Sequence, residues 1–177
     1  YFTAQLIDQA HSAASAEQRE EAENLLAFLT PICKAFMTES GLEVTNHGMQ
    51  VLGGHGFIRE WGMEQLVRDC RIALIYEGTN GIQALDLFGR KVLGSQGKLL
   101  RGFTKIVHKF CESQAEHPQL KGYVAQLSGL NQQWGALTQK IGMAAMKNPD
   151  EVGAASMDYL MYSGYVILGY FWLRMAE

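Results

Sequence analysis

One acidic residue, Glu77, stands on a short turn between two helical patterns. It is flanked by Ile75, Tyr76 and Gly78, so a pocket closed around this turn would leave its carboxylate poorly solvated. Poor solvation makes a carboxylate a stronger base, and Glu77 is therefore a candidate general base. Taken alone, a carboxylate at such a place is more often an exposed group that stabilises the N-terminus of the next helix.

Two further groups of residues could bind a ligand. Gly53 and Gly54 tolerate positive φ and have no Cβ, so backbone there can approach a cofactor closely, and Gln50 would add an amide contact. The same glycines are also typical of a helix C-cap followed by a turn. Thr79 and Asn80 begin a helix whose free N–H groups attract anions, although capping alone explains both residues.

The order and spacing of these motifs resemble the C-terminal helical domain of the acyl-CoA dehydrogenases, flavoenzymes that desaturate acyl-CoA thioesters between Cα and Cβ. The matching segments are Gln50–Phe57, Arg68–Ile72, Tyr76–Gln83 and Arg90–Lys91, within a stretch from about residue 20 to 93. Residues from about Leu99 to Met175 look like the additional C-terminal helical region of larger bacterial members of the family.

The resemblance implies a mechanism for the turn. Glu77 would remove the α-proton of the thioester while a hydride passes from Cβ to FAD. The backbone N–H of Glu77, together with a flavin ribityl hydroxyl, would bind the thioester oxygen as negative charge develops on it. Tyr76 and Gly78 would line the substrate.

By the same resemblance, Gln50, Gly53 and Gly54 contact the adenosine diphosphate part of FAD held by a neighbouring subunit, and Thr79 contacts FAD in its own subunit. Such sharing implies a homodimer or homotetramer. At the second position after Thr79, shorter family members often carry Gln or Glu, whereas this chain has Gly81. A side-chain contact to FAD at this position is therefore not predicted. An electron-transfer flavoprotein is the expected electron acceptor and the cytoplasm the expected location.

Helical periodicity runs through the whole chain, and no strand alternation interrupts it. We expect an all-α fold: an antiparallel helical bundle of acyl-CoA dehydrogenase C-terminal type from residues 1–93, a break at Gly94–Gly97, and a second helical module from residues 98–177. Because the chain starts at Tyr1 and stops within a helical pattern, we expect a piece of a longer polypeptide. The resemblance implies that this piece is inactive by itself, since family members also carry an N-terminal helical domain and a middle β-domain that holds the flavin ring and much of the CoA, and these residues resemble neither. The alternative is a noncatalytic helical module for oligomerisation or docking.

Several local features can be predicted within these modules. Pro31 bends or interrupts the helix near Thr30. Gly56 and Gly62 bracket a loop, and a short helix follows from Met63 to Ile72. Glu64 and Arg68 should form an exposed pair on that helix. The next helix should begin with a capping box of Asn80 and Gln83 and bury a face formed by Ile82, Leu85, Phe88 and Val92.

Composition excludes several classes of function. The net charge of −3 and the scattered Lys and Arg residues show no basic patch for nucleic acid. Three separated cysteines, Cys33, Cys70 and Cys111, indicate reduced, buried thiols, and the spacing of His108 and Cys111 has no second ligand pair for a metal. The run Tyr159–Leu173 is shorter than the roughly 20 residues that a bilayer requires, so it predicts a buried helix, and membrane association is not expected.

Overall fold

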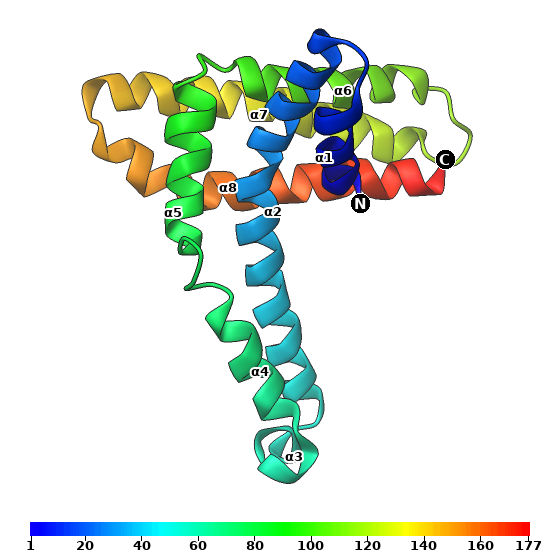
Figure 1. The fold of residues 1–177 in the computed structure, drawn as a ribbon. Coiled ribbons are helices and arrows are strands. Elements are labelled where there is room, and N and C mark those ends of the chain that lie inside the picture. Colours follow the sequence, from blue (N-terminus) through cyan, green and yellow to red (C-terminus); the bar gives the residue numbers. More distant parts are fainter.

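The computed structural model describes all residues 1–177, and it contains helices but no strand, which confirms the all-α fold. In chain order the elements are α1 (Phe2–Ser12), α2 (Ala16–Val51), α3 (Gly54–Phe57), the 3₁₀ helix η1 (Arg59–Trp61), α4 (Met63–Ile72), α5 (Asn80–Leu85), the π-helix η2 (Asp86–Leu93), α6 (Lys98–Ser113), α7 (Lys121–Lys147) and α8 (Asp150–Ala176). Figure 1 shows α6, α7 and α8 lying across one end of α2, whose other half projects away with α3 and α4 beside it.

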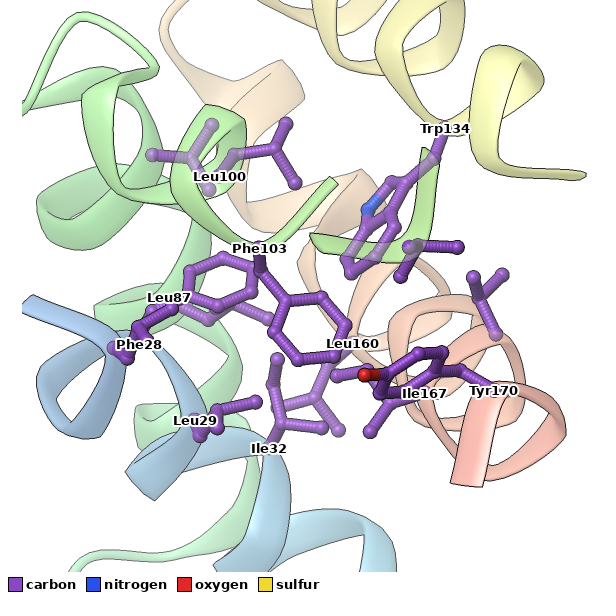
Figure 2. Packing of buried hydrophobic residues seen from close by; sticks show 14 of the residues in the cluster. Phe28, Leu29, Ile32, Leu87, Leu100, Phe103, Trp134, Leu160, Ile167 and Tyr170 are labelled. Atoms are coloured by element: carbon purple, nitrogen blue, oxygen red, sulfur yellow. The ribbon is translucent and has the colours of Figure 1, made fainter. Parts of the chain in front are cut away.

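The core lies where the N-terminal half of α2 crosses the other long helices. Phe28 of α2 is fully buried, and its ring centroid lies 6.2 Å from that of Phe103 on α6 and 5.9 Å from that of Trp134 on α7 (Figure 2). Tyr159 of α8 packs edge-on against Phe88 of η2, at 4.6 Å. A single hydrophobic cluster therefore includes side chains from both sides of the Gly94–Gly97 turn.

The other half of α2 belongs to a projecting arm, which we define as residues 37–76. Only Gly56 and Leu74 are buried within it, whereas large apolar side chains such as Phe57 and Trp61 are exposed. The arm consists of the end of α2 packed against α4, and a side chain added at Gly48 would collide with Met63. Its shape thus depends on two helices in contact rather than on a core of its own.

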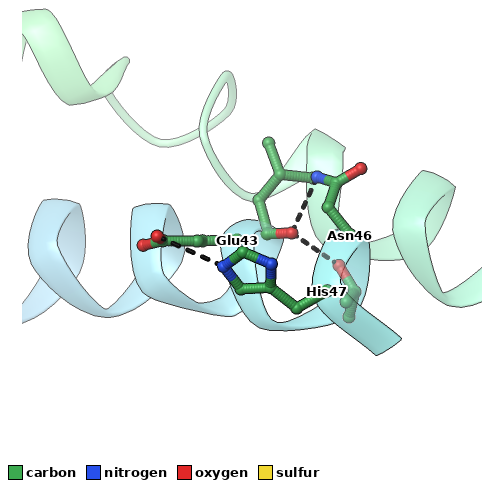
Figure 3. A network of polar contacts seen from close by, with 5 residues as sticks. Glu43, Asn46 and His47 are labelled. Carbon is green, nitrogen blue, oxygen red and sulfur yellow. Dashed lines mark hydrogen bonds and ion pairs between the residues drawn. The ribbon is translucent and has the colours of Figure 1, made fainter. Parts of the chain in front are cut away.

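Polar contacts near the end of α2 are local (Figure 3). The side chain of Asn46 donates to the carbonyl of Leu42 at 2.8 Å, and His47 Nε2 lies 3.5 Å from Glu43 Oε1. Contacts between residues four apart stabilise one helix by a few tenths of a kcal/mol, roughly 0.2–0.5 each, and do not attach it to a neighbour. They keep this end of α2 helical without fixing where the arm points.

The interruption expected at Pro31 is not found, because α2 continues through it for 36 residues. A proline inside a helix costs about 3 kcal/mol. Phe28, Leu29 and Ile32 are buried on either side of it, and each such burial contributes roughly 1.5–3 kcal/mol. Packing of the surrounding turns therefore outweighs the lost hydrogen bond.

Predictions for the chain after α2 were confirmed only in part. Helix α4 has the expected bounds, Met63–Ile72, but the expected loop between Gly56 and Gly62 contains the end of α3 and all of η1. Glu64 and Arg68 do not form the expected ion pair. Instead, the amide of Gln65 donates to Asp69 on the same helix at 2.7 Å.

The buried face of the next helix was predicted correctly at Phe88 and Val92 but wrongly at Ile82 and Leu85. Ile82 and Leu85 are 56% and 41% exposed, and the buried residues are Asn80, Ala84, Leu87, Phe88 and Val92. Asn80 faces α2, and it therefore determines which side of this helix is buried. Ala84, Phe88 and Val92 are four residues apart, a spacing that suits the wide turns of η2, where Gly94 N–H donates to the carbonyl of Gly89 five residues earlier.

The three cysteines are free, but only Cys111 is buried, while Cys33 and Cys70 are half-buried. Burial raises the pKa of the Cys33 and Cys111 thiols. His108 pairs with Glu112 at 3.4 Å rather than with Cys111, and no group of three His, Cys, Asp or Glu residues is arranged to hold a metal. Cys111 is part of the hydrophobic core and Cys33 packs against it.

The run Tyr159–Leu173 lies in α8, and Tyr159 and Leu160 belong to the hydrophobic core, as expected. By length and composition, α2 is the one helix apolar enough to cross a membrane, and 39% of its apolar window is buried in this fold. The buried part includes Phe28 and Leu29, which make core contacts.

The crossing of α2 and α8 provides a stability prediction. A Cβ added at Gly164 of α8 would collide with the ring of Phe36 on α2, which packs edge-on against Tyr165 at 5.1 Å. We expect Gly164→Ala to lower the free energy of unfolding by about 1–3 kcal/mol, because the ring must leave its position. Gly153→Ala, on the same helix with open space around it, should be neutral or stabilising in the same denaturation measurement. Equal effects at both positions would refute this close approach.

Candidate functional site

The candidate site is the turn Ala73–Thr79, which connects α4 to α5. It begins as a continuation of α4, because the N–H groups of Ile75 and Tyr76 both donate to the carbonyl of Ile72, at 2.9 and 3.2 Å. It closes where the N–H of Asn80 donates to the carbonyl of Leu74 at 3.1 Å. Leu74 is buried beneath the turn, so the loop above it, from Ile75 to Thr79, faces outward.

Two consecutive residues at the tip of the turn have left-handed backbone. Glu77 has φ +54° and Gly78 has φ +85°. Glycine adopts this conformation freely, but a glutamate there carries strain of about 1–3 kcal/mol. The side-chain amide of Gln83 donates to the Glu77 carbonyl at 3.3 Å, and Lys34 Nζ donates to the Gly78 carbonyl at 2.8 Å. The hydrogen bonds from Gln83 and Lys34 stabilise the left-handed conformation of Glu77 and Gly78.

The Glu77 side chain is exposed, and its carboxylate makes no hydrogen bond or ion pair within the chain. The closed pocket expected around it is therefore not formed by these residues. A cavity of about 700 Å³ does exist, but it lies between η2, α6 and α7 among residues such as Leu100 and Met143, and Glu77 does not line it. The carboxylate is accessible to a group outside this chain.

Backbone donors accompany the carboxylate. The N–H groups of Glu77, Gly78 and Thr79 form no hydrogen bond within the chain. An unpaired N–H beside a free carboxylate offers a hydrogen-bond donor and a base on one residue. This combination suits a reaction in which a proton leaves carbon while negative charge develops on a neighbouring oxygen.

The neighbours predicted for this site lie on the same turn. Tyr76 is 49% exposed, and Gly78 and Thr79 are exposed beside Glu77. Thr79, rather than Asn80, is the N-cap of α5, and its hydroxyl accepts from the N–H of Ile82 at 3.4 Å. A Cβ at Gly81 would have Thr79 Oγ1 as its nearest neighbour, at 4.0 Å, so space alone does not require glycine at position 81.

The other predicted residues lie elsewhere. Gln50, Gly53 and Gly54 are exposed at the far end of the arm, separated from the Glu77 turn by the ten residues of α4, a helix about 15 Å long (Figure 1). Gly53 has φ +58°, which explains the glycine. The Gln50 side chain makes no hydrogen bond within the chain. The structure thus brings Tyr76–Thr79 together but does not bring the glycine-rich segment to them.

Sequence reasoning missed Lys34 and Thr38 beside the turn, and it missed the contacts that Asn80 makes with α2. Asn80 is only 4% exposed and its side chain lies against α2, although it was expected to act as a cap. Lys34 and Thr38 are one helical turn apart on α2, next to the buried Ala35. The available signal was a lysine within the apolar run of residues 31–37, since a charged residue there requires a polar partner.

Comparison with protein families finds two matches along the chain. The family model described as "Acyl-CoA dehydrogenase, C-terminal domain" matches residues 4–93, just over half of the chain. The model described as "Acetyl-CoA dehydrogenase C-terminal like" matches residues 103–177.

Individual relatives cover most of the chain. It is 37% identical over 155 residues to 3-methylmercaptopropionyl-CoA dehydrogenase of Ruegeria pomeroyi, a match that spans 87% of this chain and 26% of that protein. It is 32% identical over 160 residues to the broad-specificity linear acyl-CoA dehydrogenase FadE5 of Mycobacterium tuberculosis, over 84% of this chain and 25% of that protein. The chain therefore spans about a quarter of the length of these curated relatives.

A solved structure shares the fold. The crystal structure of Caenorhabditis elegans ACDH-11 in complex with C11-CoA superposes with a TM-score of 0.77 at 21% identity, over 96% of this chain and 29% of that one. The arrangement of α1 to α8, arm included, thus also occurs in an experimentally determined protein.

Proposed function

Because the chain belongs to the acyl-CoA dehydrogenase family, we propose that it is the C-terminal helical region of an FAD-dependent enzyme that desaturates an acyl-CoA thioester between Cα and Cβ. One observation from the structure carries the proposal: the left-handed turn presents the free carboxylate of Glu77 together with the unpaired N–H of the same residue. The matching family regions and relatives support the class of enzyme.

In this mechanism Glu77 takes the α-proton of the thioester. An α-hydrogen beside a thioester is weakly acidic, so the base must be positioned and the carbonyl oxygen must be stabilised at the same time. The Glu77 N–H donates to that oxygen, while Tyr76 and Gly78 line the reacting part of the substrate. Bound substrate and the rest of the enzyme exclude water from the turn, which strengthens the carboxylate as a base.

FAD, when bound, supplies the acceptor for the hydride that leaves Cβ. The donors of this chain fit a phosphate- and ribose-rich ligand: Thr79 has an exposed hydroxyl and a free N–H, and Gln50 has an unpaired amide near the exposed Gly53 and Gly54. Since these two groups lie at opposite ends of α4, we propose that they serve two different FAD molecules in a homodimer or homotetramer, with the glycine-rich segment reaching the neighbouring subunit's FAD.

The proposal places the enzyme in the cytoplasm, with an electron-transfer flavoprotein as acceptor. Its first test is a series of acyl-CoA substrates of increasing chain length given to the full-length protein, with flavin absorbance followed over time. Bleaching of the flavin by at least one acyl-CoA, with formation of the 2-enoyl product, supports the function. A full-length protein that binds FAD but is bleached by no acyl-CoA in the series would refute it.

A second candidate, a noncatalytic module for oligomerisation or docking, is favoured by the exposed apolar side chains of the arm, among them Val51, Phe57 and Trp61. Under this alternative Glu77 and the glycines only shape turns. Substitution of Glu77 in the full-length protein separates the two functions. If the chain is only a docking module, the full-length protein keeps its enzymatic activity without this carboxylate.

The isolated chain provides a further prediction. On its own it should bind little FAD and desaturate no acyl-CoA, because Glu77 is exposed to solvent and the two groups of predicted FAD contacts lie at opposite ends of α4. Isothermal titration with FAD and a product assay check this. Stoichiometric tight binding, or measurable formation of enoyl-CoA, would show that residues 1–177 contain a complete site.

A further inference from the structure

We propose that Lys34 and Asn80 form a clamp that positions Glu77 for proton abstraction; the inference rests on the proposed function. Neither residue is expected to touch substrate or cofactor, so both are positioning residues. The clamp attaches the strained turn to α2, whose preceding turns are fixed in the hydrophobic core.

Asn80 is the buried half of the clamp, and both ends of its amide are satisfied by α2. The two hydrogens of its Nδ2 reach Glu39 Oε1 at 2.9 Å and Thr38 Oγ1 at 3.0 Å, and the carbonyl of Ala35 is a longer contact at 3.4 Å. Its Oδ1 accepts from Lys34 Nζ at 2.8 Å and from Thr38 Oγ1 at 3.1 Å. A buried amide with this many partners fixes both the position and the rotation of its side chain.

Lys34 connects this network to the turn itself. The same ammonium that contacts Asn80 Oδ1 also donates to the carbonyl of Gly78 at 2.8 Å. That carbonyl belongs to the residue directly after Glu77, at the second left-handed position. Hydrogen bonds from a charged donor are stronger than neutral ones, so Lys34 is the main restraint on the orientation of the Gly78 peptide.

The turn has few other attachments. Ile75 to Thr79 are exposed, and apart from the clamp the tip is held by the amide of Gln83, which donates to the Glu77 carbonyl at 3.3 Å. A glutamate with positive φ relaxes toward a right-handed or extended conformation if nothing opposes it. Relaxation would move both the carboxylate and the N–H of Glu77, and a displacement of about 1 Å at a reacting group can reduce a rate about 100-fold.

The test uses the full-length enzyme and three variants. Lys34→Met removes the ammonium and keeps the aliphatic stem, Lys34→Arg keeps a cationic donor, and Lys98→Met is the matched control. Lys98 also donates to α2, to Glu20 Oε1 at 3.0 Å, but at an exposed site away from the turn. Measurements are kcat and KM for flavin reduction, exchange of the substrate's α-hydrogen with solvent deuterium, and thermal stability.

We expect Lys34→Met to lower kcat and α-hydrogen exchange by about 10- to 100-fold, with KM changed less than about threefold. Lys34→Arg should recover most of this loss, and Lys98→Met should resemble the wild type. All four proteins should melt within a few degrees of one another. The clamp is refuted if Lys34→Met has the same kcat as Lys98→Met. It is also refuted if the decrease in kcat of Lys34→Met is fully explained by a decrease in the amount of folded protein.

A second readout does not depend on activity. In the same full-length proteins, deuterium exchange of the hydrogen-bonded amides of Asn80, Ile82 and Gln83 reports whether the turn is held. Lys34→Met should accelerate it and Lys98→Met should not. A wild-type protein that neither reduces flavin nor exchanges α-hydrogens would refute the proposed function. Amide exchange that is unchanged in Lys34→Met would refute the clamp, whatever the result for the function.

Discussion

Glu77→Gln in the full-length enzyme should reduce acyl-CoA desaturation by about 100- to 10,000-fold, the range attributed to a positioned general base. Glutamine has nearly the same shape and keeps the backbone N–H, but its amide cannot take a proton from carbon. FAD content and melting temperature should therefore remain those of the wild type, because the Glu77 side chain is exposed and its carboxylate makes no hydrogen bond or ion pair within the chain. The measurement is the rate of flavin bleaching after mixing with acyl-CoA.

Glu60→Gln provides the matched control for this substitution. Glu60 is also an exposed carboxylate on the arm, in η1, and it is not assigned a role. Its replacement should leave the rate within about twofold of the wild type, as expected for a surface group away from the chemistry. Equal rates for both variants would favour the docking alternative over the catalytic one.

Phe28→Ala should lower the free energy of unfolding by about 3–5 kcal/mol, which is the usual cost of deleting a buried aromatic side chain. Phe28 is fully buried and contacts the rings of Phe103 and Trp134. Its removal therefore opens a cavity where α2, α6 and α7 meet. Since most domains of this size are stable by only about 5–15 kcal/mol, the variant should be close to unfolding at 37 °C.

Urea denaturation of the chain, followed by tryptophan fluorescence and by circular dichroism, measures this effect. Met37→Ala is the control, because Met37 lies on the same helix but is 66% exposed, and its replacement should change stability by less than about 0.5 kcal/mol. A small effect of Phe28→Ala, comparable to that of Met37→Ala, would mean that the helices on the two sides of Gly94–Gly97 do not share one core.

Sequence reasoning predicted well those features that depend on neighbours along the chain. The helical class follows from periodicity, and the bounds of α4 follow from periodicity and from Gly62 directly before its first residue. The position of Glu77 on a turn before a helix follows in the same way. The helix is not interrupted at Pro31, because the cost of the proline is local, whereas the burial of Phe28 and Ile32 that offsets it comes from helices far along the chain.

The clamp was missed for the same reason. Asn80 looks like a capping residue in sequence, since capping involves residues two or three positions away. Its actual partners, Lys34 to Glu39, lie more than 40 positions earlier and meet it only when α5 packs on α2. The wrong choice of Ile82 for the buried face follows from this error, because the side of the helix that carries Asn80 is the side that faces α2.

A crystal structure of the full-length enzyme with FAD and a nonreacting acyl-CoA analogue would show directly whether Glu77 is the base. We expect a carboxylate oxygen of Glu77 about 3–3.5 Å from the α-carbon, with the Glu77 N–H directed at the thioester oxygen. A Glu77 side chain that points into solvent, with another residue's base at the α-carbon, would contradict this role.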